Sequence, residues 1–181
     1  MGLSDPRPNR ATNPRADLFM MRNTVCKIEK PMAAEEFEER FSVARGSSEC
    51  WAVLVDVDQI ATWVTAVGAV TEHAKLSHYG AVLEDRMGPF KLRADLDIKV
   101  TDLSEGESIT VSADGEDRQV GSRITVEATL GLVPEGEGTA VTIAGRYEVT
   151  GRVATMGAST IRSKANKMLK EFTDAAKRDL A

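Results

Sequence analysis

Hydrophobic and polar residues alternate along most of the chain between residues 36 and 149. The alternation is clearest at residues 92–101, where every second residue is apolar and the others are charged or carry a hydroxyl group. A period of two is typical of a strand with one buried face and one solvated face. The pattern predicts six or seven antiparallel strands, near residues 36–43, 70–76, 81–87, 92–101, 109–113, 124–132 and 141–149. The second of these strands is expected to end in a turn at residues 78–80.

Helices are expected at three places. Ser47 or Ser48 can cap a short helix, and Asp56 can cap a second one that carries Trp63. After Gly151 the apolar period becomes helical, which predicts a C-terminal helix of about five turns. Its apolar stripe consists of Ile161, Ala165, Met168, Leu169, Phe172, Ala176 and Leu180. The Lys and Arg residues around the stripe are expected on a solvated face, or alternatively on a surface for an acidic partner or lipid headgroups.

Together these elements predict an α+β fold in which a curved antiparallel sheet wraps around one long C-terminal helix. Two short helices follow the first strand. A sheet of six or seven strands is wider than one helix, so a gap lined by apolar side chains should remain between them. The sequence therefore predicts a cavity for a hydrophobic small molecule.

Composition limits the functions that this fold can serve. The chain has 181 residues, of which 42% are hydrophobic, and a formal net charge of -5. This length fits one domain, and the excess of acidic residues argues against a nucleic-acid partner. No apolar run approaches the roughly 20 residues of a membrane helix. The N-terminus lacks the pattern of a signal peptide, so we expect a cytoplasmic protein.

Motifs for metals, cofactors and catalysis are not recognised in the sequence. Cys26 and Cys50 lack the CxxC spacing of a zinc or redox site and are expected to be reduced thiols. His73 and His78 belong to no metal-binding motif. A nucleophile with its base, a phosphate-binding loop and a dinucleotide fingerprint are also missing. We therefore expect no metal, no cofactor and no catalytic residues.

Residues 1–30 differ from the rest of the chain. They contain three proline residues, little apolar periodicity and more basic than acidic residues. This composition predicts a flexible arm, followed by a single domain at residues 31–181. Two alternatives are a tail that docks onto a partner or lipid headgroups, and a biological start at Met21 or Met32.

Large apolar side chains are the candidates for the wall of the predicted cavity. Plain core packing is the alternative for each of them, since aromatic and Met side chains commonly fill cores. Trp63 and Phe90 are expected near an open rim because they lie at loop ends, and Met156 is expected to gate the same opening. The candidate ligand-pocket residues are Trp51, Trp63, Asp85, Met87, Phe90, Leu92, Tyr147, Met156, Met168 and Phe172.

Asp85 is the unusual member of this set. Counting back from Met87 in steps of two places Leu83 and Asp85 on the same face of the strand. An unpaired carboxylate on an apolar face is costly, so Asp85 would need a partner there. One interpretation is a polar anchor for a ligand carbonyl, or a proton acceptor. The other is a bulge or a frayed strand end that turns Asp85 to water, and we favour this second interpretation.

Several short motifs resemble those of one known family. They are Trp51-Ala52-Val53-Leu54 followed by Asp56, Met87-Gly88-Pro89-Phe90, the loop from Gly115 to Gly121, Gly136-Glu137-Gly138-Thr139, and the segment from Gly151 to Gly157. In this order they resemble the G-subunit family of carbon monoxide dehydrogenase, within the START and plant-allergen-like helix-grip superfamily, over residues 35–175. Each motif alone is only a turn or a helix start, so their shared order carries the resemblance.

The resemblance implies a helix-grip fold and a non-catalytic accessory protein of a molybdenum hydroxylase. Such a protein would carry a quinone or a lipid, or would attach the enzyme to the inner face of the membrane. The chain departs from the family at Trp63-Val64-Thr65-Ala66, where relatives have Cys-Ile-Pro-Gly. A bulkier lip of the pocket is therefore expected.

Two other functions stay open. Some helix-grip proteins are polyketide cyclases or aromatases. An enzyme of this type would hold an acid–base pair inside the pocket, with Asp85, His73 or Tyr147 as candidates. A protein–protein adaptor would instead use the N-terminal arm or the basic face of the last helix.

Overall fold

The computed structural model describes residues 34–181, so the predicted N-terminal arm lies outside the described residues. The strands are β1 (Glu35–Val43), β2 (Val67–Ala74), β3 (His78–Met87), β4 (Phe90–Ser104), β5 (Ser108–Asp117), β6 (Ser122–Glu135) and β7 (Gly138–Gly151). The helices are α1 (Ser47–Leu54), α2 (Val57–Ala61), the short 3-10 helix η1 (Val153–Met156) and α3 (Ala158–Asp179). The predicted α+β order, with two short helices after the first strand, is confirmed.

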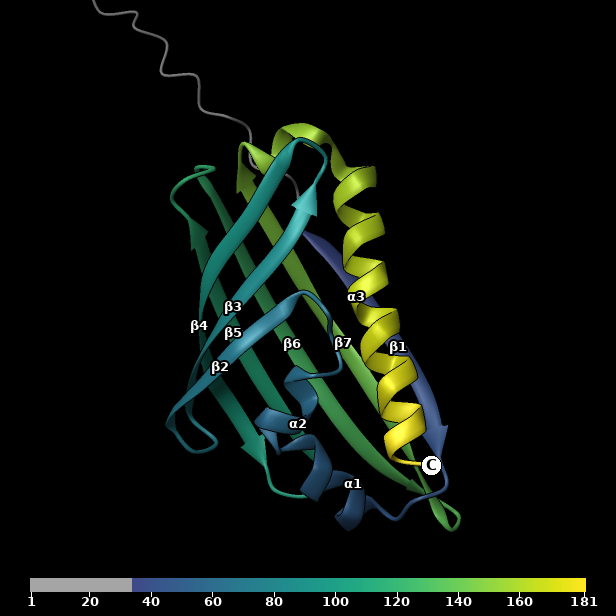
Figure 1. Cartoon of the computed structure of the whole chain (residues 1–181). Coiled ribbons are helices and arrows are strands. Elements are labelled where there is room, and N and C mark those ends of the chain that lie inside the picture. The colour runs from purple at the N-terminus through teal and green to yellow at the C-terminus, as the bar shows by residue number, and fades with distance from the viewer. Residues whose placement is uncertain (1–33) are drawn as a thin grey trace, which may run out of the picture.

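Within residues 34–181, seven strands form one antiparallel sheet in the order β1-β7-β6-β5-β4-β3-β2. Each strand from β2 to β6 pairs with the next one along the chain, and β1 pairs with β7. The sheet is strongly curved, and α3 lies along its open side (Figure 1). This arrangement confirms the helix-grip fold.

Gly145, in the middle of β7, allows a close approach between β6, β7 and β1. A Cβ atom at this position would lie 2.2 Å from the carbonyl oxygen of Glu127 and 2.8 Å from Cζ of Phe37. Such distances leave no room for a side chain, and glycine inside a strand often marks a place where another group comes this close. The space is taken by the Phe37 ring, whose centroid lies 6.4 Å from that of Tyr147.

The side chains between the sheet and the helices form two buried clusters. One joins β3, β4, β7, η1 and the first half of α3, and includes Leu83, Met87, Leu92, Val149, Val153 and Ile161. The other joins α1, the segment after α2, strands β1, β6 and β7, and the end of α3, and includes Cys50, Leu54, Trp63, Val141, Ala176 and Leu180. The long helix therefore packs onto the sheet at both of its ends.

Three local predictions needed correction. The second helix ends at Ala61 and does not carry Trp63, which lies in the segment after it. The turn between β2 and β3 lies before His78, not at residues 78–80, because β3 pairs with β4 from His78 onward. Tyr79 is buried on the inner face, and its hydroxyl accepts a hydrogen bond from the backbone N–H of Leu76. The first helix has Gly46 rather than a serine as its N-cap. The predicted cap of the second helix is confirmed, since Asp56 accepts from the Gln59 N–H at 3.2 Å.

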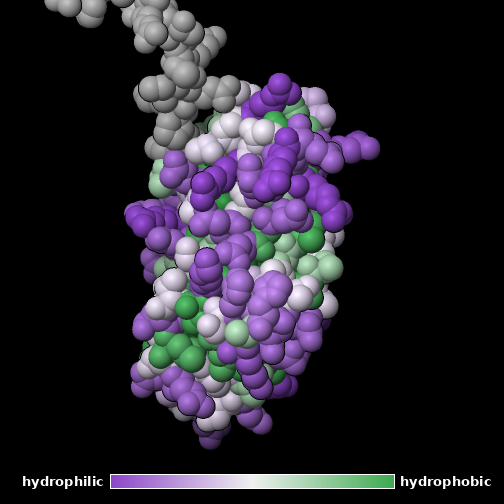
Figure 2. Space-filling model, turned by 90° about the vertical axis from the view of Figure 1, so that its left-hand side faces the viewer, coloured by the Kyte–Doolittle hydropathy of each residue, from purple (hydrophilic) through white to green (hydrophobic). Residues whose placement is uncertain are grey.

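The outer face of the sheet carries the polar half of the alternating pattern. Figure 2 shows the side of the molecule that lies to the left in Figure 1, and its surface is mainly hydrophilic with a hydrophobic area in the lower half. Among the large hydrophobic residues of the described chain, Leu103 is 41% exposed and Val133 is 55% exposed. The apolar half of the pattern faces α3, so the inner face is where a hydrophobic site can form.

Candidate functional site: an apolar cavity under the long helix

A cavity of about 430 Å³ lies between the inner face of the sheet and the first half of α3. All seven strands contribute to its sheet side, β1 through Phe37 and β2 through Val67. Most of this side comes from alternate residues of β3 to β7 with apolar or aromatic side chains. These are Leu83, Met87, Leu92, Leu96, Val111, Ile124, Val126, Ile143, Tyr147 and Val149. The strand pattern therefore supplies an almost continuous apolar wall.

The helix side of the cavity comes from the predicted apolar stripe of α3. Ile161, Ala165, Met168, Leu169 and Phe172 line it from above. Ala165 is a small residue at the centre of this set, so it leaves space where a longer side chain would reach the sheet. The width of the curved sheet and the narrowness of one helix thus produce the gap that the sequence predicts.

One ion pair and the amide side chain of Asn166 interrupt the apolar lining. Lys164 Nζ of α3 donates a hydrogen bond to Asp85 Oδ1 of β3 at 2.9 Å. The two side chains are 29% and 20% exposed, so they reach both the cavity and the solvent. They also line a smaller side opening together with Thr65, Lys167 and Glu171. The pair therefore lies at the rim of the cavity.

The position of Asp85 corrects the interpretation that we favoured from the sequence. Pairing between β3 and β4 is regular here, with Asp85 opposite Leu92 and Met87 opposite Phe90, so no bulge turns the carboxylate outward. Asp85 lies two residues before Met87 on a regular strand, so it faces inward as Met87 does. The partner that a carboxylate needs on this face is Lys164, which stands 79 residues later in the sequence.

Tyr147 contributes a further polar group to the region. The residue is 7% exposed, and its hydroxyl has no hydrogen-bond partner among the described residues. Burial raises the pKa of Tyr147 above its usual value, and the negative charge of Glu35 adds to this effect. The phenol is therefore neutral at physiological pH.

Six of the ten residues expected around the pocket line this cavity. They are Asp85, Met87, Leu92, Tyr147, Met168 and Phe172. Four of these were selected by the period of two in the strands, and two by the helical period of α3. Both periods identify the face on which a residue lies, and in this fold the two inner faces meet at the cavity.

The other four expected residues lie outside the cavity. Trp51 packs against the cluster around α1. Trp63 is 4% exposed, and its ring packs edge-on against Phe172 at 5.2 Å between centroids. Phe90 packs against the other cluster. Met156 covers the β3–β4 turn, where its Cε would lie 2.5 Å from a Cβ atom at Gly88. These residues are close to loops, but each loop folds back onto a core cluster.

Lys164 is the lining residue that sequence reasoning placed elsewhere, with the cations of the solvated face. It follows Ile161 by three positions and precedes Ala165 by one, so it stands at the border of the apolar stripe. That border position is a weak signal, because a long lysine can reach either way. At the altered lip, Val64 lines the cavity while Trp63 turns toward α3.

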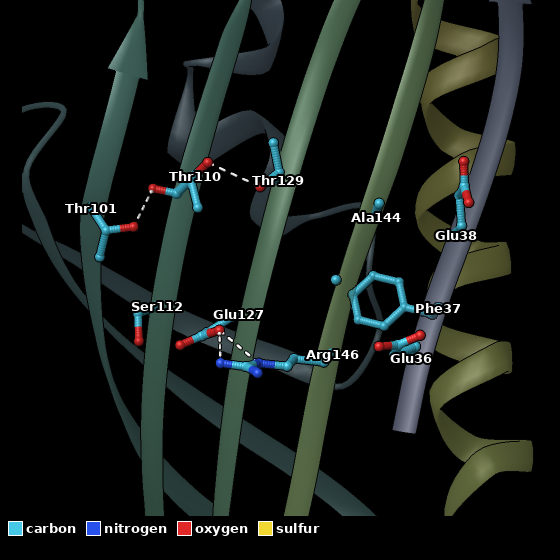
Figure 3. Close-up of a pocket in the computed structure, with 11 residues that line it drawn as sticks. Glu36, Phe37, Glu38, Thr101, Thr110, Ser112, Glu127, Thr129, Ala144 and Arg146 are labelled. Atoms are coloured by element: carbon cyan, nitrogen blue, oxygen red, sulfur yellow. Dashed lines mark hydrogen bonds and ion pairs between the residues drawn. The ribbon is translucent and has the colours of Figure 1, made fainter. Parts of the chain in front are cut away.

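A second and larger hollow lies on the outer face of the sheet. It measures about 800 Å³ and is lined by Thr, Ser, Glu and Arg side chains of strands β1 and β4–β7 (Figure 3). These groups bind one another: Arg146 Nε donates to Glu127 at 2.7 Å, and the hydroxyls of Thr110 and Thr129 lie 2.9 Å apart. Phe37 and Ala144 also line this hollow, but it is open to solvent and carries several charged side chains, so it suits a hydrophobic ligand less well than the cavity under α3.

His73 also lies away from the cavity. Its ring stacks at 4.8 Å from that of His78 near the β2–β3 turn, and His73 does not contribute to the cavity lining. Within residues 34–181, no group of three or more His, Cys, Asp and Glu side chains is arranged to hold a metal ion.

The sequence of residues 40–181 matches the family of the carbon monoxide dehydrogenase G-subunit, CoxG. The chain belongs to the CoxG family. The match covers more than three quarters of the chain, and it includes nearly all of the residues that line the cavity. No curated protein sequence matches the chain.

Solved structures agree with the helix-grip fold of this CoxG family member. A conserved protein from Geobacillus kaustophilus is similar with a TM-score of 0.70 at 20% identity, over 81% of this chain and 95% of the other. A START superfamily protein from Mycobacterium smegmatis is similar with a TM-score of 0.63 at 14% identity, over 80% and 96% of the two chains. At these identities the likeness concerns the fold.

Membership in the CoxG family and the START-like fold favour an accessory role in binding a hydrophobic molecule over a catalytic one. In this CoxG chain, the cavity under α3 is the apolar space that the fold leaves between the sheet and the long helix. Helices of the described part of the chain are too short or too polar to cross a membrane.

Proposed function

We propose that the protein binds a quinone or a lipid-like molecule in the cavity under α3, as a non-catalytic accessory protein. The observation that carries the proposal is the cavity of about 430 Å³ with an almost entirely apolar lining. An apolar void lacks van der Waals partners for its lining atoms, and an apolar occupant restores these contacts. Quinones and lipids offer the required apolar surface.

The proposed partner is a molybdenum hydroxylase complex, in line with the CoxG family. Carrying a hydrophobic molecule to or from such an enzyme requires release as well as binding, which an open cavity permits. Contact with the inner membrane surface is a further part of the proposal, since Lys and Arg residues lie on the exposed side of α3. Co-sedimentation with anionic and with neutral vesicles tests this part, and equal, weak binding to both would contradict it.

The first experiment extracts the freshly purified protein with denaturing solvent and identifies the released compounds by mass spectrometry. A quinone or lipid in stoichiometric amount supports the proposal and names the ligand class. After an empty extract, binding of an added probe becomes the deciding measurement, because a ligand absent from the expression host leaves the cavity free to accept one.

The second experiment measures binding of N-phenyl-1-naphthylamine, a neutral fluorescent probe. Val126→Phe adds a ring inside the cavity, and we expect it to weaken probe binding about tenfold or more, since the added side chain occupies the ligand volume. Val133→Phe is the matched control, because Val133 lies on the same strand but is 55% exposed. Probe binding that neither variant changes, or no binding at all, would favour a protein–protein adaptor instead.

A second candidate is an enzyme of the polyketide cyclase or aromatase type. The observation in its favour is the carboxylate–ammonium pair Asp85–Lys164 at the cavity rim, since this hypothesis requires an acid–base pair in the pocket. Incubation with a linear polyketide thioester mimic tests it. Cyclised product that disappears in Asp85→Asn, with probe binding retained, would replace the accessory role by catalysis.

A further inference from the structure

The rim of the cavity carries one negative and one positive side chain that bind each other, and we call this pair the polar anchor. Among the described residues, Asp85 and Lys164 are the charged side chains that line the cavity. They lie on opposite elements, β3 and α3, and meet at 2.9 Å. A ligand that fills the apolar space and extends to the side opening would place its end beside this pair.

The pair retains hydrogen-bonding capacity in both directions. Asp85 Oδ1 accepts from Lys164 Nζ and from the Arg86 N–H at 2.7 Å, while Oδ2 receives no hydrogen bond from the described residues. An ammonium group has three N–H donors, and the bond to Asp85 uses one. A ligand head can therefore accept from Lys164 and donate to Asp85 at the same place.

The neighbouring charges leave the anchor close to neutral. Lys167 pairs with Glu171 at 3.5 Å, and Glu84 pairs with Arg93 across β3 and β4. Glu171 also accepts a hydrogen bond from the Thr65 N–H at 3.0 Å. A charged ligand head would lose hydration at the rim without meeting an unpaired opposite charge, and this is unfavourable in a partly buried site.

We infer that the cavity selects amphipathic ligands with an uncharged, hydrogen-bonding oxygen head, and that Asp85 and Lys164 bind this head at the rim. A hydroxyl head can accept from Lys164 and donate to Asp85, and a carbonyl head can accept from Lys164. Carboxylate and phosphate heads instead compete with Asp85 for Lys164 and place a second negative charge beside it. The inference rests on the proposed function and narrows it to the ligand head. It favours neutral quinones and alcohols over fatty acids and phospholipids.

Another ion pair on α3 serves as the matched control. Arg162 of α3 binds Glu35 of β1 with two nitrogen atoms, at 2.7 Å for Nη2 to Oε1 and 3.0 Å for Nε to Oε2. This pair also joins the helix to the sheet, but neither residue lines the cavity. A variant of Arg162 thus removes a helix–sheet contact without touching the proposed anchor.

The test uses three probes with the same chain length, namely decane, 1-decanol and decanoate at pH 8, in displacement of N-phenyl-1-naphthylamine from the full chain. For the unaltered protein we expect 1-decanol to bind about tenfold more tightly than decane. This is the gain in affinity that one hydrogen bond to a charged group usually provides. Decanoate is expected to be weaker than 1-decanol. Arg162→Met should keep this order.

Asp85→Asn leaves Lys164 with an unpaired charge, so we expect decanoate to gain about tenfold and to become the preferred probe. A purely structural role of the pair would not reverse the order of the probes. Asp85→Leu combined with Lys164→Met replaces the pair by apolar side chains of similar size and guards against misfolding of the single variant. This double variant should bind decane as before and lose the preference for 1-decanol.

The outcomes separate the inference from the proposed function. Equal affinity of the unaltered protein for decane and 1-decanol, or an unchanged probe order in Asp85→Asn, would overturn the anchor while the cavity remains a binding site. Failure of N-phenyl-1-naphthylamine and of all three probes to bind would overturn both. Loss of the probe order in Arg162→Met would show that helix position, and not the pair, sets the preference.

Discussion

Trp63 Nε1 donates a hydrogen bond of 2.9 Å to Asp179 Oδ2, so the segment after α2 is joined to the last turn of α3. The same indole packs edge-on against Phe172, which lines the cavity from the other side. Trp63 thus stabilises one end of the helix from behind the cavity wall. Trp63 was expected at the rim because it lies at a loop end, but its ring belongs to the buried cluster at the end of α3.

Trp63→Phe keeps an aromatic ring but removes the indole N–H. We expect the free energy of unfolding to fall by about 1–2 kcal/mol, because a partly buried hydrogen bond to a carboxylate is lost. Probe binding in the cavity should change less than twofold, as Trp63 does not line it. Urea denaturation and probe titration check the two parts. A strong loss of probe affinity in a folded variant would place Trp63 in the ligand site after all.

Removing one partner of the rim pair should destabilise the protein more than removing one partner of the outer pair. Lys164→Met leaves the Asp85 carboxylate, 20% exposed, without its cation, and we expect a loss of about 1–3 kcal/mol. Arg162→Met leaves Glu35, whose side chain is 22% exposed, but Arg162 itself is 54% exposed against 29% for Lys164. Water therefore screens the Arg162–Glu35 pair more strongly, and a smaller loss is expected. Urea denaturation of both variants measures the difference, and equal losses would contradict it.

Tyr147→Phe should stabilise the protein slightly. It should also reduce the loss of stability that the protein shows at alkaline pH. The hydroxyl is buried without a partner among the described residues, so its removal relieves a desolvation penalty of up to about 1 kcal/mol. Burial raises the pKa of Tyr147 above 10.0. The unfolded chain then loses the phenol proton at a lower pH than the folded chain. The free energy of unfolding is therefore unaffected by the ionisation of this group below pH 10 and falls as the pH rises above 10.

The measurement is the melting temperature of both proteins between pH 7 and pH 11. The unaltered protein should lose more stability above pH 10 than Tyr147→Phe does. Burial also raises the pKa of the Cys50 thiol, which contributes equally to both proteins, so only their difference reports on Tyr147. Parallel curves for the two proteins would show that the phenol is not the group responsible.

Asp117 is expected to contribute to stability above pH 4. Its carboxylate is 3% exposed and accepts hydrogen bonds from the backbone N–H groups of Arg93, Gln119 and Val120, at 2.7, 2.9 and 2.9 Å. Burial alone would raise the pKa of Asp117, but these three bonds hold it below its usual value. A lowered pKa stabilises the folded state above the unfolded value of about 3.9, and this contribution is lost as the pH falls through the folded value.

Asp117→Asn places an amide NH₂ group against at least one backbone N–H, so a loss of about 1–3 kcal/mol is expected near pH 7. The loss should shrink as the pH falls below 4, because the unaltered carboxyl then becomes protonated. Urea denaturation at pH 7 and pH 3 checks this. A loss that does not depend on pH would contradict the role of the charged carboxylate.

The sequence by itself determined the elements and their inner faces. Alternation at residues 92–101 identified the inner face of β4, and the stripe from Ile161 to Leu180 identified the inner face of α3. The count of two from Met87 pointed to an inward Asp85, but the sequence did not show a partner for its carboxylate, and the favoured outward interpretation was wrong. Periodicity is a local property of the backbone, because each residue's direction follows from its neighbours along the chain. That is why these predictions needed no tertiary information.

Only the tertiary structure decided which inward residues face a cavity and which face a packed cluster. Trp63 and Phe172 are both inward and aromatic, yet one fills the core and the other lines the cavity. The pairing of Asp85 with Lys164 joins residues 79 positions apart. Both outcomes depend on how far the sheet curls and where α3 lies across it. Curvature and helix position arise from the packing of many distant side chains at once, and no local pattern contains them.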